Sequence, residues 1–472
     1  MANPPNVREP EARESAARAA AQRSGTRRGW AGSRDGASLG LAEPRPWARL
    51  RAAASTEPGR LWIIGTVVAV LVVAFGSITA WEVSDRSAAA DDVVSRSQPL
   101  SADAASIYRS LADADTAAAS GFLAGGQEPL DVRRRYDTDI ATASRLLVKA
   151  AANTSGSAES AQQIATLNEQ LPLYNGLVEQ ARANNRQGFP VGGAYLRFAN
   201  QKMSTSLLPA AQKLYEAETG RLYDDYDQAD AWPYAATAVG VVALGGLVWV
   251  QRRNYLRTNR VFNHGLLAAT AASTVVLLWL VVGHAVASSD LTTSRTHGQE
   301  SLKVLNDARI SSLQARANEN LTLVARGAVL TPDGKDLYEA EFTKEMSSLS
   351  GRLDAAVRLA DDGTGRTPVQ SAQGDMAEWR KRHATARKTD DSGDYDGALT
   401  QVIGAKGSTG ECFDQVDKAL DTAIAHEQHE FTTAASDGRG ALTGLPLGAA
   451  VLAVLAAAGA AVGISRRLAE YR

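Results

Sequence analysis

Four long apolar stretches without Asp, Glu, Lys or Arg constrain this chain more than any other feature of its sequence. They cover residues 61–81, 232–250, 262–287 and 442–464. Each is long enough to cross the hydrocarbon core of a bilayer, which takes about 20 helical residues. Tryptophans stand at both ends of the first two stretches, where interfacial aromatics are expected (Trp62, Trp81, Trp232 and Trp249). The sequence therefore predicts an all-α membrane protein with four transmembrane helices, and it excludes a soluble single-domain enzyme.

Charge is distributed unevenly around these stretches. Residues 1–60, 251–260 and 465–472 hold 18 basic and 7 acidic residues, whereas the rest of the chain holds 32 and 45. Because basic residues mark the cytoplasmic ends of membrane spans, we expect these three segments inside the cell. Residues 83–231 and 289–440 are then expected outside. The first stretch ends in Ala80-Trp81-Glu82 rather than in a small-x-small cleavage site, which favours a retained signal anchor over a cleaved signal peptide.

The N-terminal segment 1–60 is rich in Pro, Gly, Ala, Ser and Arg and poor in large aliphatic residues. This composition predicts a disordered basic cytoplasmic tail. Its spaced arginines favour contact with inner-leaflet lipids or a protein partner over nucleic acid. The single cysteine, Cys412, excludes an internal disulfide framework and a thiolate metal cluster.

The two expected outer segments resemble each other at a nearly constant offset of 202–205 residues. The matches are colinear: residues 112–115 with 315–318, 136–140 with 338–342, Tyr174 with Trp379, and Lys213 with Lys418. Together with two spans per copy, this pattern predicts a tandem duplication of a span–outer domain–span unit.

Each outer segment has the apolar spacing of amphipathic helices. Breaks are expected at 125–129, 153–157 and 188–193 in the first copy, and at 331–334, 361–368 and 391–397 in the second. Three breaks predict an antiparallel four-helix bundle in each copy. No break is expected between 81 and the first outer helix, or between the fourth helix and Trp232, so helix and span should be continuous.

Catalytic motifs are weak or missing. His426-Glu427-Gln428-His429 is one residue too short for a zincin motif and is interpreted as a solvated helix face. The acidic stretch 390–397 does not fit a calcium loop, and Asp394 is expected to cap a helix instead. No catalytic residue, cofactor or metal site is predicted. Gly459 and Gly463 form a G-x-x-x-G pattern suited to close packing of spans.

The outer segments resemble the four-helix-bundle sensor domains of bacterial chemoreceptors and sensor kinases, but no cytoplasmic signalling domain follows them. The whole layout, from the basic tail to the Arg-rich end, is similar to the actinobacterial four-span membrane signal relay of the GlnX type. That resemblance implies an amino-acid signal received from a solute-binding lipoprotein and passed to a cytoplasmic Ser/Thr kinase. It implies no ligand-binding residue.

The resulting prediction is a non-enzymatic transmembrane relay, with a homodimer left open. A direct small-molecule receptor and a cell-envelope scaffold remain alternatives. The expected cytoplasmic output contact comprises Arg252, Arg253, Arg257 and Arg260, and the expected outer partner patch comprises Arg133, Arg134 and Arg135. The copy-two position of that patch holds Gly334-Lys335-Asp336, so the patch is not a shared feature of both copies.

Overall fold

The computed structural model describes residues 57–153, 157–258, 263–404 and 406–469, which lie in one compact unit, Thr56–Arg472. These described residues are almost entirely helical and contain no β-strand, only an isolated bridge between Leu330 and Asp336. Four helices among them are long and apolar enough to cross a membrane. The predicted all-α membrane fold is therefore confirmed. The expected disorder of the tail falls outside the described residues, apart from 57–60.

The first half of the chain begins with one long helical run. It comprises α2 (Glu57–Asp92), the π-helical segment η1 (Val93–Ser97) and α3 (Gln98–Leu123). The chain then folds back through α4 (Leu130–Asn153) and α5 (Ala158–Arg186). It returns through α6 (Val191–Lys202), the π-helical segment η2 (Met203–Leu207) and α7 (Leu208–Asp230), and it ends in α8 (Tyr234–Thr258). We call α3–α7 the first bundle.

The second half repeats this order. It comprises α9 (His264–Thr293), the π-helical segment η3 (Ser294–Gln299), α10 (Glu300–Ala325), α11 (Leu337–Leu359), α12 (Gly363–Asp391), α13 (Tyr395–Ile403), α14 (Thr409–Leu442) and α15 (Leu445–Ala469). We call α10–α14 the second bundle. Asp394 caps α13 by accepting a hydrogen bond from the Gly397 amide at 2.9 Å, so the predicted helix cap is confirmed.

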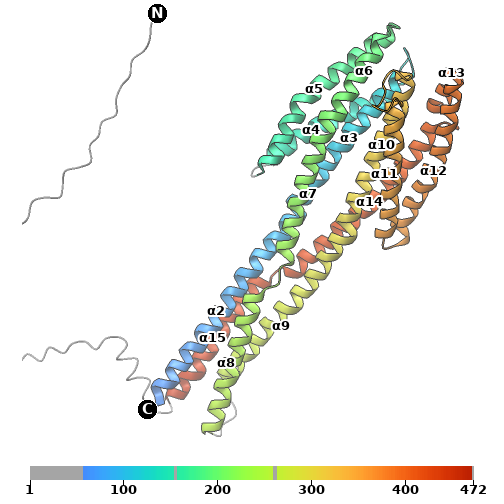
Figure 1. Cartoon of the computed structure of the whole chain (residues 1–472). Helices are drawn as coiled ribbons and strands as arrows, with labels where there is room; N and C mark the ends of the chain where they lie inside the picture. The colour runs from blue at the N-terminus through green and yellow to red at the C-terminus, as the bar shows by residue number, and fades with distance from the viewer. Residues whose placement is uncertain (1–56, 154–156, 259–262, 405, 470–472) are drawn as a thin grey trace, which may run out of the picture. The chain divides into compact units, whose positions relative to one another are not determined.

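The four span helices α2, α8, α9 and α15 run side by side (Figure 1), with α15 packed along both α2 and α9. Val72, Leu247, Leu266 and Ala460 are completely buried between them. Small residues allow close approach: a Cβ at Gly265 would collide with the carbonyl oxygen of Gly459 and with Gly463. The G-x-x-x-G pattern therefore lies at the α9–α15 contact, as small residues do in membrane helix pairs.

Three expectations about helix boundaries are wrong. The returning helices are not continuous with their spans, because α7 ends at Asp230 before α8, and α14 ends at Leu442 before α15. A second correction concerns the fourth helix of the second bundle, which is divided into α13 and α14. Residues 251–258, expected as a turn, continue α8 as helix.

The two bundles share one hydrophobic core instead of forming separate domains. Their first helices, α3 and α10, pack against each other. Thr116 Oγ1 donates to the Leu313 carbonyl at 2.9 Å, and Asn320 Nδ2 donates to Ser120 Oγ at 2.8 Å. The two bundles are therefore joined by apolar packing and by hydrogen bonds between their first helices.

Candidate functional site

Between the spans and the bundles, four helical stretches from both halves meet around a separate core. We call residues 83–97, 222–229, 287–302 and 431–442 the stalk. Its buried apolar residues come from all four stretches and include Val83, Val93, Leu222, Leu291 and Phe431. The stalk is the place where a change in the bundles would have to pass to reach the spans.

Polar contacts in the stalk join the two halves. The Tyr226 hydroxyl lies 2.6 Å from Ser294 Oγ, and this pair is buried. Arg295 forms an ion pair with Asp227 at 2.6 Å, and Arg439 forms one with Asp91 at 2.9 Å. The first two contacts link α7 to the region where α9 meets η3, and the third links α14 to α2.

The π-helical segments η1 and η3 occupy equivalent places in the stalk, since they begin at residues 93 and 294. Segment η1 packs against α7, and η3 packs against α14. π-Helical turns are rare and concentrate at functional sites, because the extra residue disturbs the regular hydrogen-bond ladder. Both helical runs that lead from a span into a bundle, the ingoing helices, therefore contain a π-helical segment in the stalk.

The break at 231–233 is held by a buried arginine. Arg86 of α2, which is 9% exposed, donates through Nε to the Ala231 carbonyl and through Nη2 to the Trp232 carbonyl at 3.0 Å. Glu82 Oε2 accepts from the Ala236 amide at 2.9 Å, and its negative charge favours the start of α8. The Trp232 ring packs edge-on against the His284 ring, with the two ring centroids 5.0 Å apart. Arg86 and Glu82 therefore fasten the exit of the first bundle to α2.

Each bundle contains one fully buried carboxyl group on its first helix. In the first bundle, Asp115 accepts from the Tyr174 hydroxyl at 3.2 Å and from Asn200 Nδ2 at 2.7 Å. Burial raises the pKa of Asp115 to about 6, although both hydrogen bonds oppose the shift.

In the second bundle, Glu319 accepts from Trp379 Nε1 at 3.1 Å and lies 2.9 Å from His383 Nδ1. Burial lowers the pKa of His383, but hydrogen bonds to Glu319 and Glu339 outweigh it and raise the pKa to about 9. Tyr174 and Trp379, which match in the sequence repeat, thus each donate to a buried carboxyl group, although Asp115 matches Asn318 in the repeat and not Glu319.

The three arginines of the predicted outer patch turn toward different neighbours. Arg133 turns toward α5 and pairs with Glu179 at 3.1 Å. Arg135 turns toward α3 and pairs with Asp113 at 2.7 Å, and it lies 3.9 Å from Asp417 of the second bundle. Of the three arginines, Arg134 is the most exposed, and it donates to the Leu130 carbonyl. Arg135 therefore helps to join the bundles.

Three of the four predicted output arginines, Arg252, Arg253 and Arg257, lie at the end of α8. Arg252 is exposed, and Arg253 lies over the Trp249 ring at 5.3 Å. Arg257 belongs to α8, but its side chain is outside the described part of the structure, as is the whole of Arg260.

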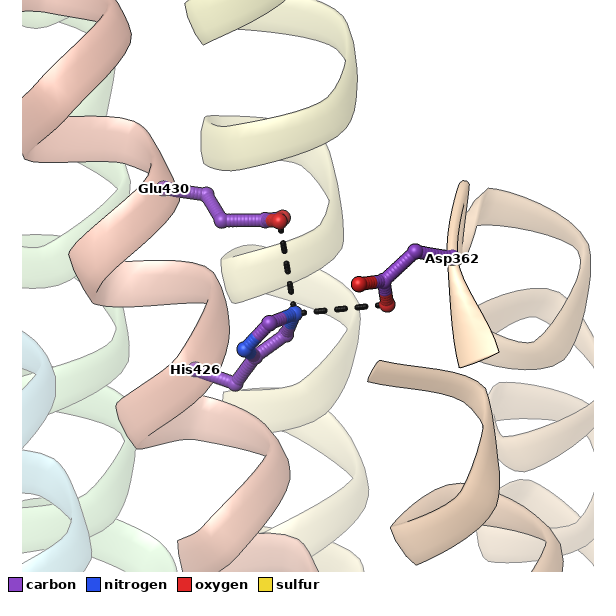
Figure 2. Close-up of side chains that lie close together, drawn as sticks. All are labelled: Asp362, His426 and Glu430. Atoms are coloured by element: carbon purple, nitrogen blue, oxygen red, sulfur yellow. Dashed lines mark ion pairs between the residues drawn. The ribbon is translucent and has the colours of Figure 1, made fainter. Parts of the chain in front are cut away.

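Among the residues that the structure describes, one group of side chains has donor atoms close enough to hold a metal ion. Figure 2 shows His426 Nε2 pointing between two carboxylates, 3.4 Å from Asp362 Oδ1 and 3.3 Å from Glu430 Oε1. Donors bound at about 2.0–2.1 Å around tetrahedral zinc are spaced about this far apart. A protonated His426 satisfies the same geometry as an ion pair that joins the start of α12 to α14.

The interpretation of residues 426–429 as a solvated face is only partly right. His429 is exposed, whereas His426 is partly buried and Glu427 is 3% exposed. Burial raises the pKa of Glu427 to about 7. The helical spacing alone did not show that the start of α12 covers this face.

Comparison with known families bears on the first bundle. Residues 89–227 match the family model described as Actinobacterial sensor domain. The match begins in the stalk part of α2 and ends in the stalk part of α7, so it contains all of the first bundle except the last three residues of α7. Comparison with curated proteins and with solved structures yields no match. The family match, joined to four membrane-capable helices, supports a sensing or signalling membrane protein of actinobacterial type.

Proposed function

We propose that the chain is a non-enzymatic transmembrane signal relay whose bundles lie outside the cell. The observation that carries this proposal is the pair of helical runs α2–η1–α3 and α9–η3–α10, which pass unbroken from span to bundle. A continuous helix transmits displacement along its axis, because its turns are joined by backbone hydrogen bonds. A sensor-like bundle at one end and a span at the other make such a run suited to transmission.

The proposed orientation, with the bundles outside the cell, rests on the arginines at the span ends, because basic residues mark cytoplasmic ends. Reporters that are active only outside the cell, fused after Gly156 and after Arg472, test it directly. We expect activity at the first position and silence at the second. The reverse pattern would place the bundles in the cytoplasm and remove the basis of the relay.

The partners are proposed from the resemblance to the GlnX-type relay. They are an extracytoplasmic solute-binding lipoprotein that supplies an amino-acid or nutrient signal, and a cytoplasmic Ser/Thr kinase that receives it. Arg252 and its neighbours at the end of α8 are the proposed output contact. Neighbouring genes for both partners would support this assignment.

The output contact is tested by a variant in which Arg252, Arg253, Arg257 and Arg260 are changed to Gln. We expect loss of kinase capture in cross-linked membranes, with the bundles still folded. The matched control changes Arg466 and Arg467 at the end of α15 to Gln, and both variants are checked with the topology reporters. Unchanged capture by a correctly inserted variant excludes this surface as the contact.

A direct receptor is the second candidate. It is favoured by a charged cavity between the two bundles, because a small molecule could enter this cavity without a binding protein. The two candidates share the relay through the stalk and differ only in what reaches the bundles from outside.

A further inference from the structure

A hollow lies between the two bundles beside the α3–α10 contact. Its volume is about 320 Å³, and it is bounded by α3 and α7 of the first bundle and α10 and α11 of the second. Three basic and three acidic side chains converge on it: Lys303, Lys344, Arg352, Asp307, Glu216 and Glu345. This volume lies at the lower end of the range of about 300–1,000 Å³ found for small-molecule sites, but the lining is mainly polar and charged, so it suits a small charged ligand and not an apolar one.

The charges come mainly from one half of the chain. With the offsets of the sequence repeat, 203 for α3 with α10 and 202 for α4 with α11, uncharged residues stand at the matching positions of the first half. They are Leu100 for Lys303, Ala104 for Asp307, Thr142 for Lys344, Ala143 for Glu345 and Ala150 for Arg352. A scaffold of two similar bundles does not itself require charges at this place.

The opposite groove between the halves contains a network of ion pairs that joins them. That groove is bounded by α4 and α14, the counterparts of α11 and α7. There Arg309 pairs with Asp417 at 2.8 Å and with Asp421 at 2.6 Å, and Arg135 reaches the same Asp417. At the positions that match these two aspartates with an offset of 205, the cavity has Gln212 and Glu216. This network of ion pairs crosses the groove beside α4 and α14, whereas the groove beside α7 and α11 contains the cavity; we call the latter the open groove.

The three cations in the open groove already have partners within the protein, two of them in ion pairs and Arg352 on a backbone carbonyl group. Lys303 lies 3.1 Å from Asp307, Lys344 lies 2.8 Å from Glu341, and Arg352 Nη1 donates to the Asp307 carbonyl at 3.0 Å. A ligand of one sign would leave a protein charge unpaired, which is costly in a partly closed site. A ligand with both signs exchanges partners without that cost. Burial raises the pKa of Tyr108 to about 12, so its hydroxyl stays neutral beside the charges.

We propose that this cavity binds a small zwitterion, a molecule with one carboxylate and one ammonium group. Arg352 and Lys303 on the second bundle receive the carboxylate, and Glu216 on α7 of the first bundle receives the ammonium group. The ligand then joins the two bundles across their interface. That this joining of the bundles produces a signal rests on the proposed function, whereas the binding itself does not.

The test is calorimetry on the full chain in lipid nanodiscs. The probes are the common L-amino acids and glycine betaine, together with N-acetyl and amide derivatives of whichever compound binds. We expect at least one zwitterion to bind with a Kd below about 1 mM, or about −4 kcal/mol. Removing either charge from the ligand should weaken binding at least tenfold.

Variants assign that binding to the cavity. Arg352→Gln and Glu216→Gln should each raise the Kd at least tenfold, and Ser348→Trp, which fills the hollow, should abolish binding. Arg358→Gln is the matched control, since Arg358 is exposed on another face of α11. Because Arg352 also holds α11 to α10, the melting temperature of each variant is measured. Glu216 is exposed, so its variant should fold normally.

The outcomes separate this site from the relay. Absence of binding by every zwitterion overturns the site, and so does binding that survives Ser348→Trp or that tolerates loss of a ligand charge. Binding in the cavity without any change in kinase capture supports the site and counts against the relay. Signalling by a protein that binds no zwitterion supports the relay and counts against the site.

Discussion

Asp115 gives the most direct quantitative test of the interior of the first bundle. Its carboxyl group is buried between Tyr174 and Asn200, and its pKa rises from 3.8 in an unfolded chain to about 6. A difference of about 2.2 pKa units corresponds to about 3 kcal/mol at roughly 1.36 kcal/mol per unit. Asp115→Asn removes the charge and keeps two hydrogen-bonding atoms, because the Asn200 amide can turn to present its oxygen.

The sign of the effect follows from proton linkage. Because the folded pKa is the higher one, the protonated carboxyl favours folding below pH 4, and this contribution is lost as the pH rises through 6. Above pH 6 the wild-type protein must bury a charge that the variant lacks. We therefore expect the variant to melt at the same temperature as wild type near pH 4 and about 3–4 °C higher above pH 7, since the entropy of unfolding is about 2.1 cal/mol/K per residue over roughly 400 residues.

The assay follows the melting of the full chain in detergent by tryptophan fluorescence between pH 4 and pH 8. Other groups with raised pKa values contribute equally to both proteins and cancel in the difference. Asp224→Asn, at an exposed position on α7, is the matched control and should give no pH-dependent difference. A constant or absent difference between Asp115→Asn and wild type would refute the burial argument.

Three further substitutions test other contacts by the same melting assay. Gly265→Ala should destabilise the spans by about 1–3 kcal/mol through overpacking, while Gly245→Ala, which meets no neighbouring atom, should be neutral; equal effects would contradict the close α9–α15 contact. Arg86→Gln should cost about 1–3 kcal/mol because carbonyl groups at the helix break lose their donors, and an unchanged melting temperature would show that water replaces them. Trp379→Phe should cost a similar amount by removing a donor to Glu319, and a neutral result would mean that the remaining partners suffice.

The sequence predicts the spans and most of the helix breaks because both depend on local composition. The stretch 442–464 is long and apolar whatever surrounds it, and the loop at 125–129 contains Gly and Pro. The break before α8 also had a local signal. Pro233 disfavours helical geometry at Trp232, but the apolar run that starts there was interpreted as uninterrupted.

Other features depend on contacts that no local pattern contains. Arg133 and Arg135 stand two positions apart, so in a helix they face different neighbours, and only the packed structure shows which carboxylates they reach. The segments η1 and η3 have no composition that distinguishes them from α-helix. Their equivalence becomes visible only when both ingoing helices are placed in the stalk.

The neighbours of the ingoing helices change between the bundles and the spans. In the bundles, α3 packs directly against α10, whereas in the spans the same two runs, as α2 and α9, touch each other only slightly and each packs mainly along α15. Gly76 of α2 approaches Ala453, and Gly265 of α9 approaches Gly459, so α15 presents small residues to both. A displacement of α3 relative to α10 must therefore reach the membrane as a change at two faces of α15. In the proposed relay, the last span, with Arg466 near its end, is therefore a second candidate route for output in addition to the α8 arginines.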